Sequence, residues 1–132
     1  MSVALFFITH EGIASNLISI GEAIIKKTNN NLSYSEVAMD ADIATVIENI
    51  EKNLERLDTK EGLLFFTDIY GSTPSNIAQQ LANKYQAHLI SGINLPMIMR
   101  LLNYRDEAEN VLIQKALEGA RKCIQDNAPE TE

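Results

Sequence analysis

The residues of this sequence best suited to chemistry are a histidine and an aspartate that each follow an apolar run. His10 stands one threonine beyond the run Val3–Ile8, and Asp68 directly follows Gly62–Thr67. A carboxylate that accepts a hydrogen bond from one imidazole nitrogen fixes the tautomer and leaves the other nitrogen free as a base, a ligand or a nucleophile. A single histidine is a weak signal, so the interpretation depends on whether the fold brings His10 to Asp68.

A second chemical feature is the segment that begins shortly after Asp68. It reads Gly71-Ser72-Thr73-Pro74. Glycine lets the backbone approach a ligand closely, the two hydroxyl groups can donate hydrogen bonds, and proline favours the first turn of a helix. The free N–H groups of that turn attract anions. The same residue types also occur in ordinary helix caps, so the sequence leaves both an anion seat and a simple cap open.

Other chemistries lack the residues that they need. Two histidines, His10 and His88, and the single Cys123 give no spacing typical of a metal site. A serine hydrolase using Ser72 or Ser75 would lack the Gly-x-Ser-x-Gly elbow. A phosphate-binding loop of the Gly-x-x-x-x-Gly-Lys-Ser/Thr type is absent. We therefore expect no metal ion and no cofactor.

The elements that must position these residues alternate along the chain. Short apolar runs predict strands, and longer segments with a period of 3.6 residues predict helices. The expected strands are Val3–Ile8, Leu32–Met39, Gly62–Thr67 and Ala87–Ile90. The expected helices are Ile13–Lys27, Asp42–Leu57, one from Pro74 to about Tyr85, Asn94–Leu102 and one that begins at Asp106.

This alternation predicts an α/β fold with a mostly parallel, doubly wound sheet covered by helices on both faces. In a flavodoxin-like strand order 2-1-3-4, the first and third strands are neighbours. His10 and Asp68 would then meet in one crevice at the carboxyl ends of the strands. The length of 132 residues fits a single domain over residues 1–132, with about 127–132 as a frayed tail.

The charge balance narrows the class of partners. Lys and Arg total 11 and Asp and Glu total 18, which gives a formal net charge of −7. This excess of acid disfavours nucleic acids and anionic membrane surfaces and suits a basic protein partner. The apolar runs are shorter than the roughly 18 residues of a membrane span, and the first one lacks the flanks of a signal peptide. We therefore expect a cytoplasmic protein.

The motifs together resemble a known family. Ile8-Thr9-His10, the long segment 63–76 and the segment 91–97, which contains Gly-Ile-Asn-Leu-Pro-Met, match it in order and spacing. The family is the enzyme IIA domain of the mannose family of the bacterial phosphoenolpyruvate:sugar phosphotransferase system. The similarity extends from residue 3 to about residue 124, and the two longer motifs are specific in combination.

The resemblance implies a phosphohistidine carrier, and hence a phosphotransferase. His10 matches the phosphorylated histidine, which in this family carries the group on Nε2. Asp68 matches the aspartate that holds the other ring nitrogen, while Ser72 and Thr73, next to Gly71, fall where the family contacts the phosphoryl group. The phosphocarrier HPr would be the donor and an enzyme IIB the acceptor, with the chain peripheral to a membrane permease at most.

The resemblance also implies a homodimer with an exchanged strand. A further antiparallel strand would then lie near residues 100–106 or at the C-terminus. A different class of function uses the same histidine, namely a stand-alone regulatory module whose His10 phosphorylation state controls a partner. A weaker alternative is the related phosphotransfer subunit of dihydroxyacetone kinase.

Two positions depart from the family pattern. Glu11 stands directly after His10, where the family usually has glycine. A carboxylate there would oppose an incoming phosphoryl group if it pointed inward, so we expect it to face solvent. The segment Gly71-Ser72-Thr73-Pro74 replaces the commoner Gly-Gly-Ser-Pro and keeps the hydroxyl groups.

Overall fold

The computed structural model describes residues 2–27 and 30–131 of the chain. Four strands and five helices alternate along these residues. The strands are β1 (Ala4–His10), β2 (Leu32–Val37), β3 (Leu63–Thr67) and β4 (His88–Ser91). The helices are α1 (Ala14–Ile25), α2 (Ile43–Leu54), α3 (Thr73–Tyr85), α4 (Leu95–Asn103) and α5 (Glu109–Lys122). None of these helices has both the length and the apolar character needed to cross a membrane.

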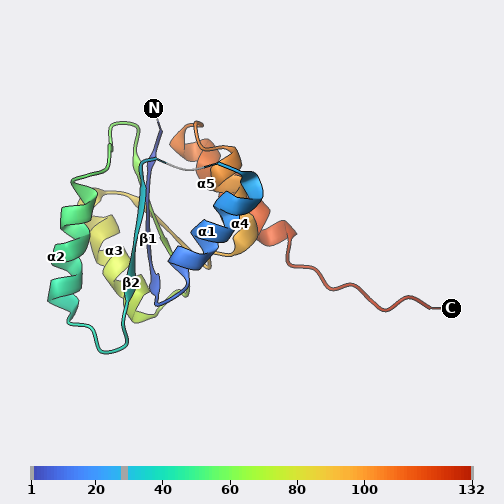
Figure 1. The fold of residues 1–132 in the computed structure, drawn as a ribbon, viewed down its shortest axis with the longest axis horizontal. Helices are drawn as coiled ribbons and strands as arrows, with labels where there is room; N and C mark the ends of the chain where they lie inside the picture. The colour runs from blue at the N-terminus through green and yellow to red at the C-terminus, as the bar shows by residue number, and fades with distance from the viewer. Residues whose placement is uncertain (1, 28–29, 132) are drawn as a thin grey trace.

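The strands form one parallel sheet in the order β2-β1-β3-β4. This order confirms the predicted flavodoxin-like topology. The central strands β1 and β3 read as continuous apolar runs because helices cover both faces of the sheet, as Figure 1 shows. Helices α1, α4 and α5 lie on one side, and α2 and α3 lie on the other.

Each face of the sheet has its own hydrophobic core, and β1 contributes to both. Phe7 packs in the core under α1, α4 and α5, whereas Phe6 and Ile8 pack in the core under α2 and α3. Successive side chains of a strand point to opposite faces. Thr9 therefore points toward α1, and His10 points toward the side of α2 and α3.

Two helices and one strand end two or three residues earlier than predicted. The first helix ends at Ile25 rather than Lys27, the second strand at Val37 rather than Met39, and the second helix at Leu54 rather than Leu57. Helix α1 stops because Lys26 adopts a left-handed conformation with φ 60° and donates its N–H to the Glu22 carbonyl. The left-handed residue is a lysine rather than a glycine, so the sequence carried no clear stop signal there.

The first strand is longer than predicted. It continues past Ile8 because Thr9 and His10 pair in register with Glu36 and Val37 of β2. This extension carries His10 to the last position of the strand. The histidine therefore stands on the sheet itself rather than on a flexible loop.

Polar side chains cap the starts of α2 and α4. Asn94 accepts a hydrogen bond from the Met97 N–H at 3.0 Å at the start of α4. Asp42, predicted as the first helical residue, is instead the N-cap of α2 and accepts from the Thr45 N–H at 3.3 Å. Both caps satisfy backbone donors that the first turn would otherwise leave free.

The additional strand expected near residues 100–106 does not form there. This stretch is the end of α4 followed by a turn, which the Glu107 N–H closes on the Tyr104 carbonyl at 3.0 Å. The same turn delays the last helix, which begins at Glu109 rather than Asp106. Residues 124–131 have no helix or strand and extend away from the body in Figure 1.

Candidate functional site

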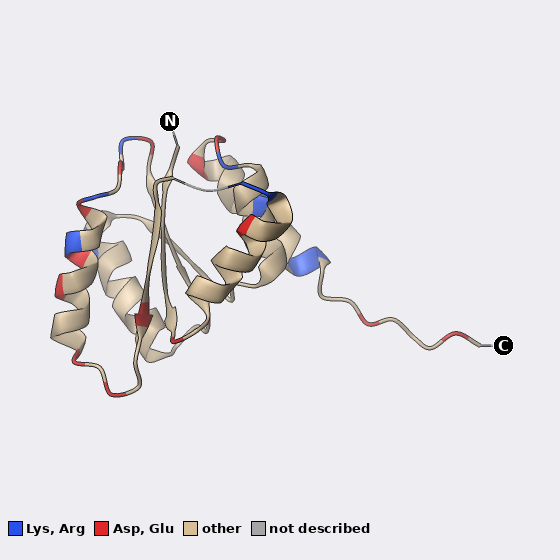
Figure 2. Ribbon diagram, viewed as in Figure 1, with Lys and Arg blue, Asp and Glu red and all other residues tan. Residues whose placement is uncertain are grey.

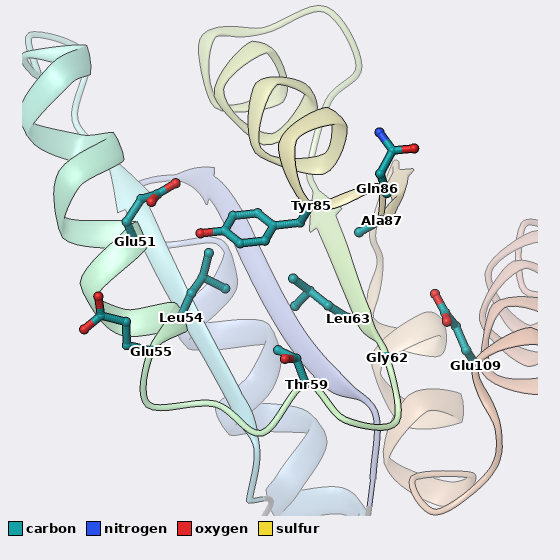
Figure 3. Close-up of a pocket in the computed structure, with 10 residues that line it drawn as sticks. All are labelled: Glu51, Leu54, Glu55, Thr59, Gly62, Leu63, Tyr85, Gln86, Ala87 and Glu109. Atoms are coloured by element: carbon teal, nitrogen blue, oxygen red, sulfur yellow. The ribbon is translucent and has the colours of Figure 1, made fainter.

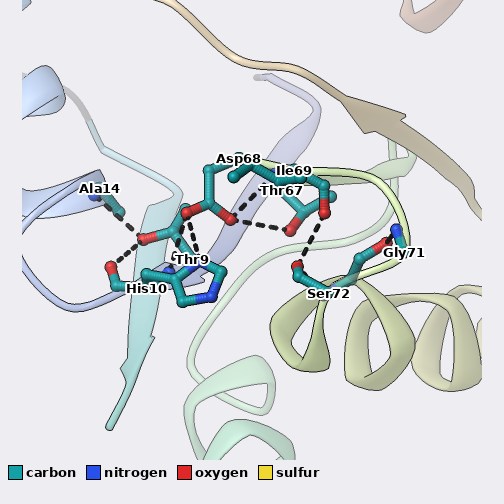
Figure 4. A network of polar contacts seen from close by, with 9 residues as sticks. Thr9, His10, Ala14, Thr67, Asp68, Ile69, Gly71 and Ser72 are labelled. Atoms are coloured by element: carbon teal, nitrogen blue, oxygen red, sulfur yellow. Dashed lines mark hydrogen bonds and ion pairs between the residues drawn. The ribbon is translucent and has the colours of Figure 1, made fainter. Parts of the chain in front are cut away.

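The candidate site lies where β1 and β3 end side by side, as Figure 4 shows. The His10 Nδ1 atom lies 2.7 Å from the Asp68 Oδ2 atom. The backbone N–H of His10 also donates to Asp68 Oδ2, at 3.1 Å. The predicted meeting of these two residues is therefore confirmed, and its cause is the strand order, since β1 pairs directly with β3.

The carboxylate of Asp68 fixes the state of the histidine ring. Burial raises the pKa of Asp68, but hydrogen bonds from the ring and backbone of His10 and from its own loop outweigh this and hold the pKa below its ordinary value. An ionised Asp68 can only accept, so the Nδ1 atom of His10 carries a proton, and in the neutral ring Nε2 is then the atom with the lone pair. Figure 4 shows the second ring nitrogen on the far side of the ring from Asp68.

The start of α3 borders this free nitrogen. Ser72 is the N-cap of α3, since its Oγ accepts from the Ser75 N–H at 3.4 Å and donates to the Ile69 carbonyl at 2.7 Å. Gly71 has a φ of +86°, a conformation that favours glycine. Thr73 is exposed, and its hydroxyl has no hydrogen-bond partner within the described part of the chain. The capping role of Ser72 is confirmed, whereas phosphoryl contacts remain a prediction.

The sequence and the fold can now be compared with known proteins. Residues 4–117 match the model of the family described as the PTS system fructose IIA component, EIIA-man. The chain belongs to this family. As a mannose-family IIA component of the phosphotransferase system, it is a member of a phosphotransferase family, as the motifs predicted.

Individual relatives of this IIA component agree with the family match. The chain is 28% identical over 127 residues to the mannose-specific EIIAB component of Escherichia coli K12, which covers 94% of the chain. The chain spans only 39% of the length of that relative. It is 30% identical over 78 residues to the fructose-specific EIIA component of Bacillus subtilis, covering 58% of the chain and 53% of that protein.

The fold of the IIA component is also found in solved structures. The mannose/sorbose specific IIA subunit from Enterococcus faecalis superposes with a TM-score of 0.82 over 100% of both chains, at 17% identity. At that identity the likeness shows a shared fold. It confirms the architecture that holds His10 at the end of a central strand.

Two residues that hold the other side of His10 were missed by the sequence reasoning. Thr9 is fully buried, and its Oγ1 accepts from the Ala14 N–H at 3.1 Å and donates to the His10 carbonyl at 2.8 Å. Glu36 of β2 accepts from both the N–H and the hydroxyl of Ser15, at 2.8 and 2.6 Å. The sequence held one hint of these contacts. No side chain that could cap a helix directly precedes α1, so its first turn needs partners from elsewhere.

An apolar hollow of about 470 Å³ opens beside the His10–Asp68 pair. It lies between α1, the loop after β3 and the start of α4, and its lining includes Ile13, Leu17, Ile20, Asp68, Ile69 and Ile93. Large apolar side chains are exposed around it, since Ile69 is 61% exposed and the neighbouring Tyr70 is 81% exposed. Exposed apolar surface of this kind marks a place where another molecule binds.

We call the loops after the four strands, with the first turns of the helices that follow, the His10 edge. Residues 9–25, 37–51, 67–83 and 91–99, which include these segments, contain no Lys or Arg. Figure 2 shows acidic and no basic residues along the lower loops of the ribbon, which belong to this edge. Glu11 is exposed, as expected. The His10 edge is therefore apolar and acidic.

A second hollow, of about 380 Å³, lies at the opposite edge of the sheet around the start of β3, and Figure 3 shows it. Its polar lining includes Glu51, Glu55 and Glu109 together with Tyr85. The described residues hold no group of three or more His, Cys, Asp or Glu side chains arranged to bind a metal ion. This hollow is remote from His10 and shares none of its residues with the candidate site.

Proposed function

We propose that this IIA component is a phosphohistidine carrier that accepts a phosphoryl group from HPr on His10 and passes it to an enzyme IIB. The single observation that carries the proposal is the 2.7 Å contact between His10 Nδ1 and Asp68. This contact leaves Nε2 as a neutral nucleophile on a half-buried side chain that is 37% exposed. Membership of the family supports the assignment of the group that is transferred.

The transfer is a displacement at phosphorus. The Nε2 lone pair of His10 attacks the phosphoryl group of the donor phosphohistidine, the new N–P bond forms, and the donor N–P bond breaks with its electron pair returning to the donor nitrogen. Asp68 keeps the Nδ1 proton in place and stabilises the positive charge that develops on the ring. In the onward transfer His10 is the leaving group: an enzyme IIB histidine attacks phosphorylated His10, and the bond between Nε2 and phosphorus breaks.

The start of α3 would hold the oxygens of the transferred group. The N-terminus of a helix carries partial positive charge, which favours an anion, although here Pro74 has no N–H and the Ser75 N–H is bonded to Ser72. The Thr73 hydroxyl is free to donate. Ser72 donates to the Ile69 carbonyl in this structure, so its hydroxyl must rotate before it can contact a phosphoryl oxygen.

The surface around His10 favours a protein over a small phosphorylated metabolite as the phosphoryl donor. A site for a free phosphate ester is expected to supply Lys or Arg, and the His10 edge contains neither. The exposed Ile69 and Tyr70 beside the apolar hollow suit a globular partner instead. The acidic charge of this edge suits a partner with a basic face.

The first half of the proposal is tested by phosphorylation followed by intact mass. The protein is incubated with phosphoenolpyruvate, enzyme I and HPr, and one phosphoryl group adds about 80 Da. We expect this adduct on the wild type and on His88→Ala, which removes the other histidine, and none on His10→Ala. An adduct that persists in His10→Ala, or is absent from the wild type, would overturn the proposal.

The second half is tested by adding a purified mannose-family enzyme IIB to the isolated phosphoprotein. We expect the added mass to leave this chain and to appear on the enzyme IIB. Retention of the phosphoryl group in the presence of enzyme IIB would favour the regulatory alternative, in which His10 phosphorylation controls a partner without onward transfer.

Homodimerisation is part of the same proposal. Strand β4 is an edge strand that pairs only with β3 among the described residues, and such an edge offers free backbone groups to another chain. Light scattering tests this, because a monomer has a mass of 14.7 kDa and a dimer twice that value. A monomer mass at the protein concentrations used in phosphotransfer assays would contradict homodimerisation.

A further inference from the structure

The first turn of α1 is closed by side chains from two different strands. Thr9 of β1 accepts from the Ala14 N–H at 3.1 Å, as Figure 4 shows. Glu36 of β2 accepts from the Ser15 N–H at 2.8 Å and from its hydroxyl at 2.6 Å. The residue at the cap position, Ile13, makes no side-chain cap. Two neighbouring strands therefore supply the capping that the helix sequence itself lacks.

The register of the sheet explains this arrangement. Thr9 pairs with Glu36 across β1 and β2, so the two side chains lie next to each other on the α1 face. His10 is one residue further on and points to the opposite face, toward Asp68. The carboxylate of Glu36 therefore lies beside the reactive strand without sharing the face of the imidazole.

Two helix N-termini follow the site residues closely along the chain. Helix α1 begins four residues after His10, and α3 begins five residues after Asp68. Both termini would attract an anion if their N–H groups were free. At α1 the donors are already used by Thr9 and Glu36. The ionised carboxylate also repels a second anion. At α3 the Ser75 N–H is used by Ser72 and Pro74 has no N–H, so Thr73 is the position of that turn left for the group.

The turn that follows His10 is held at both ends. Asp68 accepts from the His10 N–H at one end, at 3.1 Å. At the other end, the Gly12 carbonyl accepts from the Asn16 side chain at 2.6 Å, and Glu36 accepts from the Ser15 N–H at 2.8 Å. Gly12 has a φ of +83°, a conformation that glycine adopts without strain and that lets the chain turn from β1 into α1.

The charge on Glu36 follows from the same hydrogen bonds. Burial raises the pKa of this carboxyl, but the hydrogen bonds from Ser15 and from the Gly12 N–H outweigh it and hold the pKa below its ordinary value. The side chain therefore stays ionised at neutral pH and remains a strong acceptor for the first turn of α1.

We propose that Glu36 is a positioning residue for phosphoryl transfer at His10, closing the N-terminus of α1 to the phosphoryl group and fixing the turn that follows the histidine. The proposal rests on the phosphocarrier function above. Glu36 does not touch the reacting atoms. It acts through Ser15, and it occupies the N-terminus of α1, which would otherwise attract an anion.

One experiment tests the closed N-terminus without any phosphotransfer. Inorganic phosphate is titrated into ¹⁵N-labelled protein while the amide signals of Gly12, Ser15 and Thr73 are followed. In Glu36→Ala we expect Gly12 and Ser15 to shift with phosphate, whereas in the wild type and in Glu48→Ala, an exposed control on α2, they stay fixed. Equal shifts of Gly12 and Ser15 in the wild type and Glu36→Ala would overturn the proposal.

A second experiment tests positioning during transfer. The single-turnover rate of phosphorylation by phospho-HPr is expected to fall about 10-fold in Glu36→Ala, because loss of a supporting hydrogen-bond partner misplaces the reacting group. The dissociation constant for HPr should be unchanged. Glu36→Gln keeps an oxygen acceptor for the Ser15 N–H, so it should recover most of the rate.

The outcomes separate the two proposals. A wild type that takes no phosphoryl group from HPr contradicts the phosphocarrier function, and the phosphate titration still decides whether Glu36 closes α1. A wild-type rate in Glu36→Ala, with the wild type fully active, overturns the positioning role alone. Equal loss in Glu36→Ala and Glu36→Gln also overturns it, since the shared acceptor oxygen would then have no effect.

Discussion

At the scale of single residues, the pair of His10 and Asp68 decides which atom would react in the proposed phosphoryl transfer. Asp68 receives both the ring Nδ1–H and the backbone N–H of His10 on one oxygen, so it fixes the rotamer and the tautomer together. The consequence is a free Nε2 that needs no proton transfer before it attacks. A histidine without this partner would divide its population between two tautomers.

Replacing Asp68 with asparagine should slow phosphorylation by about 100-fold. The amide keeps the shape of the side chain but removes the charge that holds the Nδ1 proton. The rate is measured by rapid quench with phospho-HPr, with Glu11→Gln as the matched control, because Glu11 is the exposed carboxyl next to His10. A comparable loss in Glu11→Gln would mean that the negative charge near His10, and not the contact between Asp68 and the ring, sets the rate.

Acid should destabilise the wild type more than it destabilises Asp68→Asn. The pKa of Asp68 is lower in the folded protein than in the unfolded chain, so protonation of this carboxyl favours unfolding. Its stabilisation is complete above about pH 4 and is lost as the pH falls through the folded-state pKa. Urea unfolding at pH 7 and pH 3 measures the difference. Parallel losses of the free energy of unfolding in both proteins would contradict this.

At the scale of secondary-structure elements, the site is a meeting of strand ends and helix starts. The strand β1 places His10, β3 places Asp68, and the first turns of α1 and α3 border them from two sides. The two turns have opposite roles in this account. The first turn of α1 is capped by Thr9 and Glu36 from the strands, whereas that of α3 is capped by its own Ser72 and leaves the Thr73 hydroxyl exposed.

Removing the cap of α3 should separate stability from phosphoryl binding. Ser72→Ala is expected to lower the free energy of unfolding by about 1 kcal/mol, and Asp42→Ala, which removes the cap of α2, should do the same. Only Ser72→Ala should also slow phosphorylation. Thr73→Ala should slow it with a stability change under about 0.5 kcal/mol. Slowed phosphorylation in Asp42→Ala would show that the effect comes from stability alone.

The element pattern could be predicted from the sequence where it rests on local signals. Continuous apolar runs gave the central strands, and Asn94 marked the start of α4. The role of Glu36 could not be predicted, because it depends on the pairing of β1 with β2, which no local pattern encodes. The end of α1 was missed because Lys26, rather than glycine, adopts the left-handed conformation.

At the scale of the whole molecule, the charge is divided unevenly. All eleven Lys and Arg lie outside the four segments that form the His10 edge. The net charge alone does not show where the acidic and basic residues lie. Figure 2 shows basic residues near the opposite end of the ribbon and at the side. An acidic edge around the reactive histidine attracts a basic partner over a distance of about 10 Å at moderate salt.

Raising the salt concentration should therefore slow association with HPr more than it slows the chemical step. The second-order rate constant is expected to fall about 10-fold between 0.05 and 0.5 M salt. Asp40→Asn, on the loop after β2, should weaken this dependence, whereas Glu55→Gln in the remote hollow should leave it unchanged. An identical salt dependence in both variants would place the docking surface elsewhere.

The central claim is that His10 carries the phosphoryl group on Nε2 while Nδ1 keeps its proton against Asp68. Long-range ¹H–¹⁵N correlation spectra of protein labelled in its histidine rings, recorded after phosphorylation through HPr, distinguish the two ring nitrogens directly. The account predicts phosphorylation of His10 at Nε2, with a protonated Nδ1. Phosphorylation at Nδ1 of His10, or at His88, would contradict it.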